Sequence, residues 1–237
     1  MEKMKFSIVI PLWNEEKNIE KLISSFNFEI LLNLGLVELL LVNNGSTDNS
    51  KSILNSLPQN PLLKVVHLEE NLGYGGGILH GIQLTKTNII CYLPGDLQYT
   101  FDDLIKVINI YILNSSNIKL FVKGYRIQRQ DSRSGKFVSR FYSFLARLVL
   151  GIKIMDFNGL PKMFDKSLLF ESKYELESSF VLDAHLLYIA TLSNFKIIEV
   201  PVNFYKRNSG VSSWSNKKLR TYFQTLIAII AMRIKYF

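Results

Sequence analysis

The first half of the chain alternates apolar runs with stretches of helical periodicity, and this alternation constrains the fold more than any other feature. Five mostly apolar runs have the length of strands; they cover residues 6–12, 37–44, 62–68, 88–93 and 118–125. Between them, apolar side chains recur three and four positions apart, as at Ile19, Leu22 and Phe26. This pattern predicts an α/β, Rossmann-like fold with a mostly parallel central sheet and helices on both faces.

Polar or glycine-rich segments follow four of these predicted strands. They cover residues 11–15, 43–48, 71–77 and 94–98. The carboxyl ends of parallel strands meet at one edge of a sheet, where open α/β sheets bind their ligands. Because four such segments converge on that edge, we expect a ligand site there.

The glycine cluster at 73–77 resembles a dinucleotide-binding loop only superficially. It follows a strand and precedes a helix, but the third glycine of G-x-G-x-x-G falls on Ile78, and the strand is the third rather than the first. This disfavours a nicotinamide or flavin cofactor. Two alternatives stay open: backbone N–H groups that cradle a diphosphate, or tight packing of a helix on a strand.

Asp96 and Gln98 follow the Pro-Gly pair at the end of the fourth strand. Both offer the hard oxygen ligands that Mg²⁺ or Mn²⁺ prefers when it bridges a nucleotide diphosphate. Their spacing of two residues puts both on one side of an extended segment. The alternative is that Asp96 only shapes a turn.

The charge balance indicates which ligands suit this chain. Lys and Arg number 28 against 20 Asp and Glu, a net charge of +8, which suits phosphorylated ligands, nucleic acid or an anionic membrane surface. No nucleic-acid-binding motif accompanies the charge, so we expect no nucleic-acid partner. The single Cys91 excludes an intramolecular disulfide and a cysteine-rich zinc site.

The second half is basic and less regular. We expect a basic loop over 126–140, a helix over 141–151, a strand over 195–204 and a mobile polar loop over 205–218. The basic loop either holds a phosphate group or is a solvated surface run. Its cations are Arg126, Arg129, Arg133, Lys136 and Arg140.

No repeat or clean linker divides the chain, so we expect one domain over 1–215, followed by a basic and apolar helix over 216–237. The N-terminus is typical of a first strand rather than of a signal peptide. No run reaches the ~18 apolar residues of a membrane span. The last helix either packs on the domain or lies on a membrane surface.

Seven segments carry a family resemblance: IPLWNEEKNI, LVNNGSTDNS, ENLGYGGGI, GDLQ, GYRIQRQDSR, DFNGLPKMF and EVPVNFYKRNSGVS. Their order resembles family-2 glycosyltransferases with a GT-A fold, and more narrowly the polyprenyl-phosphate, dolichol-phosphate-mannose-synthase-like branch. The resemblance implies an inverting enzyme that moves one sugar from a nucleotide-diphosphate sugar to a polyprenyl phosphate during cell-surface glycan synthesis. It implies that Mg²⁺ or Mn²⁺ is a cofactor and that the enzyme lies in the cytoplasm, on the inner face of the membrane. A homo-oligomer is compatible with this resemblance.

Matched residue by residue, the family's nucleotide site falls on the first strand ends. The resemblance implies that the nucleotide is bound by Pro11, Trp13, Glu15, Asn43, Asn44, Gly73, Gly75 and Asp96. The family's Asp-Asp-Gly-Ser reads Asn-Asn-Gly-Ser at 43–46 in this chain. An Asn amide both donates and accepts, so recognition of a base survives the exchange.

The family's metal motif, Asp-x-Asp-x-Gln, has Pro94 in place of its first acid. The resemblance leaves Asp96 and Gln98 as metal ligands, together with donor phosphates and water. We therefore expect weaker metal affinity when the donor is absent. A rival hypothesis is that Lys and Arg side chains supply part of the metal's electrostatic effect.

The basic loop and the region beyond it match the family's acceptor and diphosphate positions. Arg126 matches Gly-x-Arg best, Arg129 comes next, and Arg133, Lys136 and Arg140 align loosely. Arg207 and Ser212 match a motif near the donor diphosphate. Asp156 matches the acid before the strand over the acceptor site.

Asp183 falls on the first acid of the family's Asp-x-Glu pair, and His185 replaces the Glu. We assign both, together with Asp96, to catalysis, with helix capping as the alternative for Asp183. A sugar hydroxyl would need such a base, whereas a lipid phosphate is already an anion at neutral pH. Two rival functions stay open: transfer to a glycan hydroxyl, and nucleotide-sugar binding without catalysis.

Overall fold

A computed structural model describes residues 3–116, 118–171, 176, 179–207 and 218–236. Within these residues the chain forms a seven-stranded sheet in the order β3-β2-β1-β4-β6-β5-β7. The strands are β1 Phe6–Leu12, β2 Leu36–Asn44, β3 Leu63–Leu68, β4 Ile89–Tyr92, β5 Leu120–Arg129, β6 Lys162–Asp165 and β7 Lys196–Phe204. The helices are α1 Ile19–Ser24, α2 Phe28–Leu34, α3 Ser50–Asn55, α4 Gly73–Gln83, α5 Phe101–Asn114, α6 Arg133–Leu150, the 3-10 helix η1 Lys166–Phe170, α7 Leu182–Leu192 and α8 Lys218–Lys235.

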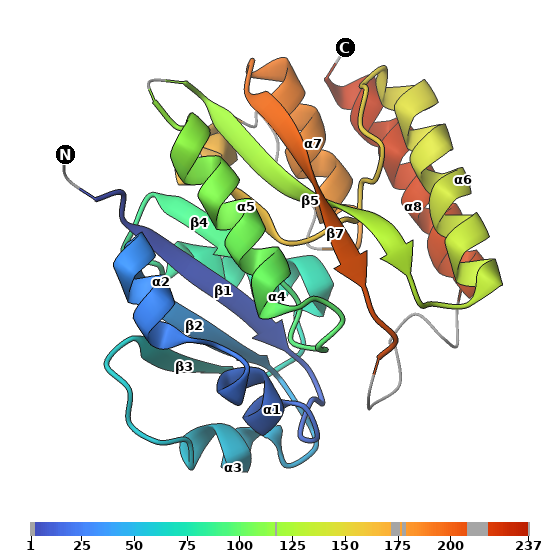
Figure 1. The fold of residues 1–237 in the computed structure, drawn as a ribbon. Helices are drawn as coiled ribbons and strands as arrows, with labels where there is room; N and C mark the ends of the chain where they lie inside the picture. Colours follow the sequence, from blue (N-terminus) through green and yellow to red (C-terminus); the bar gives the residue numbers. More distant parts are fainter. Residues whose placement is uncertain (1–2, 117, 172–175, 177–178, 208–217, 237) are drawn as a thin grey trace.

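The sheet is mostly parallel, as predicted. Strand β1 pairs in parallel with β2 and β4, β2 with β3, and β5 with β7; β6 alone runs antiparallel between β4 and β5. Helices cover both faces (Figure 1). The central strands are therefore buried on both sides, which is why β1 and β2 read as apolar runs without alternation.

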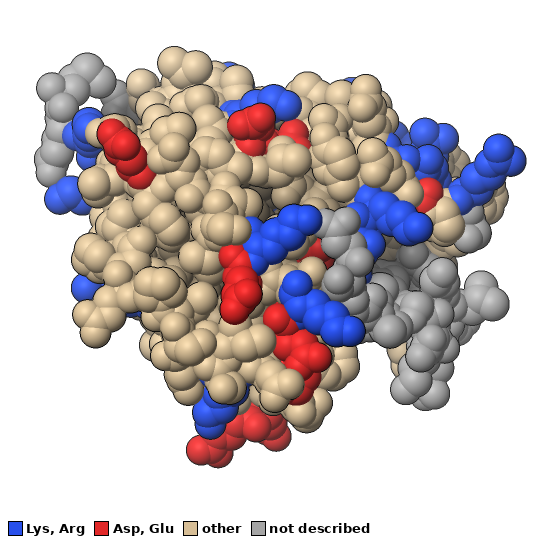
Figure 2. All heavy atoms as spheres, turned by 60° about the horizontal axis from the view of Figure 1, so that its bottom comes forward, with Lys and Arg blue, Asp and Glu red and all other residues tan. Residues whose placement is uncertain are grey.

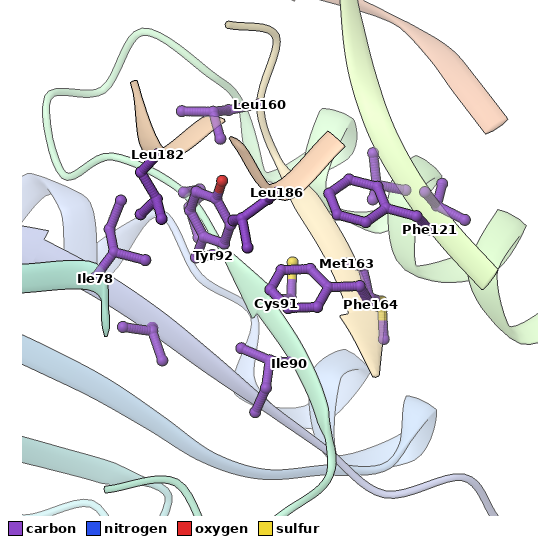
Figure 3. Packing of buried hydrophobic residues seen from close by; sticks show 14 of the residues in the cluster. Ile78, Ile90, Cys91, Tyr92, Phe121, Leu160, Met163, Phe164, Leu182 and Leu186 are labelled. Carbon is purple, nitrogen blue, oxygen red and sulfur yellow. The ribbon is translucent and has the colours of Figure 1, made fainter. Parts of the chain in front are cut away.

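The core continues across the antiparallel strand. Figure 3 shows Tyr92 of β4, Phe121 of β5 and Phe164 of β6 packed together under Leu182 and Leu186 of α7. The rings of Phe121 and Phe164 stack with centroids 5.1 Å apart. These contacts join the two halves of the sheet into one core.

The glycine cluster lies inside α4 rather than before it. A Cβ on Gly77 would lie 2.9 Å from Nδ2 of Asn44, and a Cβ on Gly81 would lie 2.5 Å from Cγ1 of Val9. These two glycines therefore allow α4 to pack closely on β1 and β2. Such packing was one of the two roles that the sequence left open for the glycine cluster; a cradle for a diphosphate was the other. The close packing brings the N-terminus of α4 to the sheet edge where β1 and β2 end.

The predicted basic loop over 126–140 is wrong. Strand β5 continues to Arg129 and pairs with β7 as far as Phe204. Helix α6 then begins at Arg133, where the side chain of Ser132 accepts a hydrogen bond from the N–H of Gly135. Arg133, Lys136 and Arg140 therefore lie on a helix that extends the predicted 141–151 helix by two turns.

Helix α8 accounts for the helix predicted over 216–237. It packs beside α6 and also contacts α7 (Figure 1). Of the helices that the structure describes, none has both the length and the apolarity to cross a membrane. The predicted boundary at residue 215 lies outside the described residues and stays a prediction.

Candidate active site

A cavity of about 360 Å³ opens at the sheet edge where β1, β2 and β4 end. Its walls come from these strand ends, the first turn of α4, Phe180 and Arg207. The lining residues that the sequence predicted are Pro11, Trp13, Glu15, Asn44, Gly73, Asp96 and Arg207. Five further lining residues belong to the predicted segments but were not singled out, namely Leu12, Asn71, Tyr74, Pro94 and Gly95, and Phe180 was missed.

Reciprocal hydrogen bonds hold the first two strand-end loops together. The N–H of Asn14 donates to Oγ of Ser46 at 3.0 Å, and Oδ1 of Asn14 accepts from the N–H of Thr47 at 2.8 Å. Asn14 adopts a positive φ of 55°, which Asn tolerates better than most residues. This local turn fixes Trp13 and Glu15 at the rim of the cavity.

Glu15 is a buried carboxylate at the cavity wall. Nδ2 of Asn18 donates to it at 2.5 Å, and Arg207 forms an ion pair with it. Burial raises the pKa of Glu15 to about 7, although Asn18 and Arg207 oppose the rise and the nearby charge of Asp96 adds to it. The ion pair with Arg207 thus involves a carboxylate whose pKa lies near neutral pH.

The two asparagines at the end of β2 organise loops. Asn44 donates from Nδ2 to Oδ1 of Asn71 and to the carbonyl of Gly73, and it accepts from the N–H of Leu72. Asn43 accepts from the N–H of Ser46 and pairs with Nδ1 of His67. Both amides are thus engaged within the protein.

Two of the residues predicted to bind the nucleotide do not line the cavity. Asn43 does not line the cavity, because its amide lies against β3 at His67. Gly75 is buried inside the first turn of α4, behind Gly73. Recognition of a base by the Asn43 amide therefore has no support in this geometry.

Asp96 both shapes a turn and lines the cavity. Its Oδ1 accepts from the N–H of Gln98 at 3.2 Å, which closes a turn with Leu97 at a φ of 60°. The same carboxylate lines the cavity. Burial raises its pKa, and the charge of Arg207 opposes that rise.

Gln98 holds a different contact from the one predicted. Its Nε2 donates to the carbonyl of Tyr205 at 3.0 Å, and the N–H of Tyr205 donates back to its carbonyl at 2.9 Å. Gln98 therefore ties this turn to the end of β7 and does not line the cavity. Its side-chain oxygen is the atom left for a metal.

We tested whether these residues fit a divalent cation. Across the described part of the chain, no group of three or more His, Cys, Asp or Glu side chains could hold a metal. Asp96 presents one carboxylate to the cavity, and Glu15 is engaged by Asn18 and Arg207. The residues fit a cation that shares its coordination with donor phosphates and water, not one held by protein alone.

A second cavity of about 280 Å³ lies between the end of β5 and α6. Four arginines line it, namely Arg126, Arg129, Arg140 and Arg147, with Ser139, Ser143 and Asp156 among their neighbours. Arg133 and Lys136 do not line it, and Arg147 was missed. In Figure 2, basic side chains predominate at the right-hand end of the molecule, where α6 lies in Figure 1.

Two of these arginines are held rigidly by acids. Arg126 donates to both carboxylate oxygens of Asp156 at 2.7 Å, and Arg129 pairs with Asp131 at 2.6 Å. Burial by itself would raise the pKa of Asp156. The Arg126 guanidinium has the larger, opposite effect and holds the pKa of that carboxyl below its usual range. Both guanidinium groups also lie over the ring of Phe204.

The other two arginines of this cavity, Arg140 and Arg147, are exposed and form no ion pair with a described residue. Their positive charges are available to a ligand. Residues 96–99 connect the two cavities. Asp96 lines the first cavity, and the ring of Tyr99 packs on Phe204, over which the guanidinium groups of Arg126 and Arg129 lie.

The sequence model described as Glycosyl transferase family 2 matches residues 7–171, which is more than half of the chain and includes all of the strands that form the first cavity. The chain belongs to glycosyl transferase family 2. It is a glycosyltransferase enzyme, as the motif order predicted.

Two curated relatives of this glycosyltransferase act on polyprenyl phosphates by name. The dodecaprenyl-phosphate galacturonate synthase of Rhizobium johnstonii is 25% identical over 244 residues, covering 99% of this chain and 69% of that protein. The undecaprenyl-phosphate 4-deoxy-4-formamido-L-arabinose transferase of Yersinia pestis is 24% identical over 231 residues, covering 95% and 67%. The resemblance to this branch is thereby confirmed.

A solved structure supports the fold. The glucosyl-3-phosphoglycerate synthase of Mycobacterium tuberculosis, crystallised with Mn²⁺, uridine diphosphate and glucosyl-3-phosphoglycerate, superposes with a TM-score of 0.72 at 20% identity. The match covers 97% of this chain and 79% of that one. The GT-A-like α/β fold predicted for this glycosyltransferase is confirmed.

Asp183 of the glycosyltransferase lies in a buried cluster behind the cavity. Its carboxylate accepts from Nζ of Lys162, from the Tyr92 hydroxyl at 2.6 Å and from the Tyr74 hydroxyl at 3.1 Å. Lys162 is fully buried, and burial lowers its pKa to about 8. Because three donors already hold Asp183, the geometry does not support it as a base, and it does not cap α7 either.

His185 also does not line the cavity. Its Nε2 lies 3.0 Å from the hydroxyl of Tyr236, on the side of α7 that faces α8. Burial lowers its pKa to about 4, so the ring is neutral at neutral pH. The assignment of His185 to catalysis stays a prediction.

The sequence analysis missed an aromatic wall of the cavity. The rings of Tyr74 and Phe180 stack with centroids 5.5 Å apart, and both line the cavity. Tyr74 is the one aromatic residue within the glycine cluster, and this position could have marked it as a site residue. Ser212, which the family motif places near the diphosphate, lies outside the described residues.

Proposed function

We propose that this glycosyltransferase moves one sugar from a nucleotide-diphosphate sugar to a polyprenyl phosphate, with inversion at the anomeric carbon. The observation that carries the proposal is the second cavity, where four arginines line a space of about 280 Å³. Guanidinium groups match phosphate oxygens in geometry and charge. The names of the two curated relatives point to the same class of acceptor.

The first cavity suits the donor. Pro11 and Trp13 would flank the base and ribose, and Arg207 would face the diphosphate from the opposite wall. Trp13 is 40% exposed, so a base can stack on it without displacing a core side chain. Glu15 would release Arg207 to the diphosphate once a more strongly anionic partner arrives.

A divalent cation, Mg²⁺ or Mn²⁺, is part of this proposal. Asp96 would hold it together with the diphosphate oxygens, and the side-chain oxygen of Gln98 would be a second ligand from the protein. When bound, the cation neutralises the charge of the leaving diphosphate. The solved structural neighbour contained Mn²⁺ and uridine diphosphate, which supports this assignment.

The acceptor needs no general base in this proposal. A phosphate monoester has a second pKa near ~6 and is therefore a dianion for the most part at neutral pH. Its oxygen forms a bond to the anomeric carbon while the bond from that carbon to the donor diphosphate breaks. This agrees with the engagement of Asp183 by Lys162, Tyr74 and Tyr92.

Such an acceptor also implies a place in the cell. We propose that the enzyme works on the cytoplasmic face of the membrane and contributes to cell-surface glycans. A homo-oligomer stays a prediction.

The test is a comparison of acceptors. The protein would be incubated with UDP- and GDP-sugars, Mn²⁺, and either a short polyprenyl phosphate or a free sugar. We expect an acid-labile sugar phosphate product with the lipid only. Product on the free sugar alone would support transfer to a glycan hydroxyl, and no transfer or hydrolysis with any donor would support a nucleotide-sugar-binding protein.

A further inference from the structure

Two aromatic side chains form one wall of the first cavity, and the proposed contacts to the base, the diphosphate and the cation use neither of them. Tyr74 comes from the first turn of α4, and Phe180 comes from the segment just before α7. Their rings stack at an interplanar angle of 16°. We call these two residues the aromatic wall. An apolar surface among the polar groups of a cavity suits the part of a ligand that has an apolar face.

The position of Tyr74 is fixed from behind the cavity. Its hydroxyl donates to Oδ2 of Asp183 at 3.1 Å, while Oδ1 of Asp183 accepts from the Tyr92 hydroxyl and from Nζ of Lys162. Burial and the charge of Asp183 raise the pKa of the Tyr74 hydroxyl, so that it keeps its proton and stays a donor. The ring is thus held in place before a ligand arrives, which lowers the entropic cost of binding.

A sugar ring suits the aromatic wall. Its C–H bonds lie together on one face, which an aromatic ring can cover, while its hydroxyls point to the sides. Trp13, on which the base would stack, is 40% exposed, whereas both residues of the aromatic wall are half-buried. The sugar is the end of the donor opposite to the base. It would therefore lie deeper in the cavity than the base does, against the aromatic wall.

The charges of the cavity restrict the sugar further. Two acids line it, Glu15 and Asp96, and Arg207 is the one basic side chain among its described lining residues. Arg207 already pairs with Glu15, and in the proposed function it also faces the diphosphate. Lys162, behind the aromatic wall, is fully buried and donates to Asp183. A sugar carboxylate would therefore meet two acids without a cation of its own among the described residues, which is unfavourable.

We propose that Tyr74 and Phe180 form the platform for the donor sugar and that the cavity selects an uncharged sugar. The two rings contact the C–H face of that sugar. Asp183 and Lys162 are positioning residues, because they hold Tyr74 and do not themselves line the cavity. This inference rests on the proposed function for the presence of a nucleotide-diphosphate sugar, and it adds the chemical class of the sugar.

The first test compares sugars that differ only at C6, which is a hydroxymethyl group in one and a carboxylate in the other. The full chain would be titrated calorimetrically, with Mn²⁺ present, against UDP-glucose and UDP-glucuronate and, in parallel, against GDP-mannose and GDP-mannuronate. In the series whose nucleotide binds, we expect the carboxylate to weaken binding by about tenfold or more. Equal or tighter binding of the uronate would overturn the selection of an uncharged sugar.

The second test separates the sugar from the rest of the donor by titrating each variant with the nucleotide sugar and with the free nucleoside diphosphate. Tyr74→Ala and Phe180→Ala should each weaken the nucleotide sugar by about five- to tenfold, a usual value for one aromatic contact, and leave the nucleoside diphosphate within about twofold. Tyr74→Phe keeps the ring but loses the hydrogen bond to Asp183, so its loss should be smaller than that of Tyr74→Ala. Trp13→Ala is the matched control. It removes an aromatic side chain from the same cavity and should weaken both ligands by the same factor.

The outcomes distinguish the platform from the proposed function. If Tyr74→Ala and Phe180→Ala weaken the nucleotide sugar and the nucleoside diphosphate equally, or weaken neither, the platform is overturned while the donor site stands. If the unchanged chain binds neither nucleotide series, the proposed function is overturned, and the platform with it. A loss confined to the nucleotide sugar, with partial rescue by Tyr74→Phe, supports both.

Discussion

Asp96 and Asp183 lie in two neighbouring regions that differ in how many partners they offer to a carboxylate. Asp96 stands at the cavity wall, where one backbone N–H donates to it and Arg207 supplies a positive field. Asp183 stands behind that wall, where Lys162 and two tyrosines hold it. The motif assigns chemistry to both acids, but the surroundings leave only Asp96 with capacity for a ligand.

The same contrast separates the four arginines of the second cavity. Arg126 and Arg129 are paired with Asp156 and Asp131, so they shape the cavity. Arg140 and Arg147 have no such partner among the described residues and bring net charge to it. A residue type at a motif position is therefore a weaker indicator of function than the number of partners that it already has.

The largest expected effect concerns the buried pair. Lys162→Met leaves Asp183 buried without its counter-charge and should lower the free energy of unfolding by about 3–5 kcal/mol. Denaturant unfolding measures this, and the double variant Lys162→Met, Asp183→Leu should recover most of the loss. A single variant as stable as the unchanged protein would show that the pair is not the centre of this cluster.

The second-largest effect is expected at Asp96, the carboxylate that lines the first cavity. Asp96→Asn should lower kcat by about 100- to 1,000-fold, because it removes the charge that would hold a cation at the donor diphosphate. The melting temperature should change little, since Asn can keep the turn. Asp102→Asn, at an exposed position in the first turn of α5, is the matched control. Full activity of Asp96→Asn would mean that Asp96 is only a turn residue.

Much of the fold could be predicted from the sequence, because strands buried on both faces are apolar throughout. The start of α6 could not, because its first four residues, Arg-Ser-Gly-Lys, have the composition of a loop. The site residues at strand ends were also predictable, since β1, β2 and β4 end at one edge.

The partners of those residues could not be predicted. Lys162 is 21 positions from Asp183, and Tyr74 is 109 positions away, so only the folded chain shows that they meet. Asn43 turns toward His67 on the neighbouring strand for the same reason. Pairing across the sheet decides whether a polar side chain faces a ligand.

A smaller effect is expected from the pH dependence of Glu15. Burial raises its pKa from 4.5 to about 7, so the folded state keeps a proton that the unfolded state has lost. Stability should therefore fall as the pH rises from 4.5 to 7, by roughly 2 kcal/mol relative to Glu15→Gln. Urea unfolding at a series of pH values measures this. Glu20→Gln, exposed on α1, should keep the full dependence, and parallel curves for the unchanged chain and Glu15→Gln would contradict the raised pKa.

The smallest expected effect concerns Pro94. Pro94→Asp restores a second carboxylate beside Asp96 and should tighten binding of Mn²⁺ in the absence of donor by about tenfold. Isothermal titration of the protein with Mn²⁺ measures this affinity, and the donor-bound affinity should change less. An unchanged affinity would indicate that residue 94 does not face the cation.

The most direct test of the central claim is titration of the protein with a short polyprenyl phosphate and, separately, with a nucleoside diphosphate. If the arginine cavity holds the acceptor phosphate, the double variant Arg140→Ala, Arg147→Ala should weaken acceptor binding by about tenfold or more. Nucleoside diphosphate binding should stay within about twofold of the unchanged protein, since neither arginine lines the first cavity. Equal acceptor affinity in the two proteins, or a loss confined to the nucleoside diphosphate, would contradict the account.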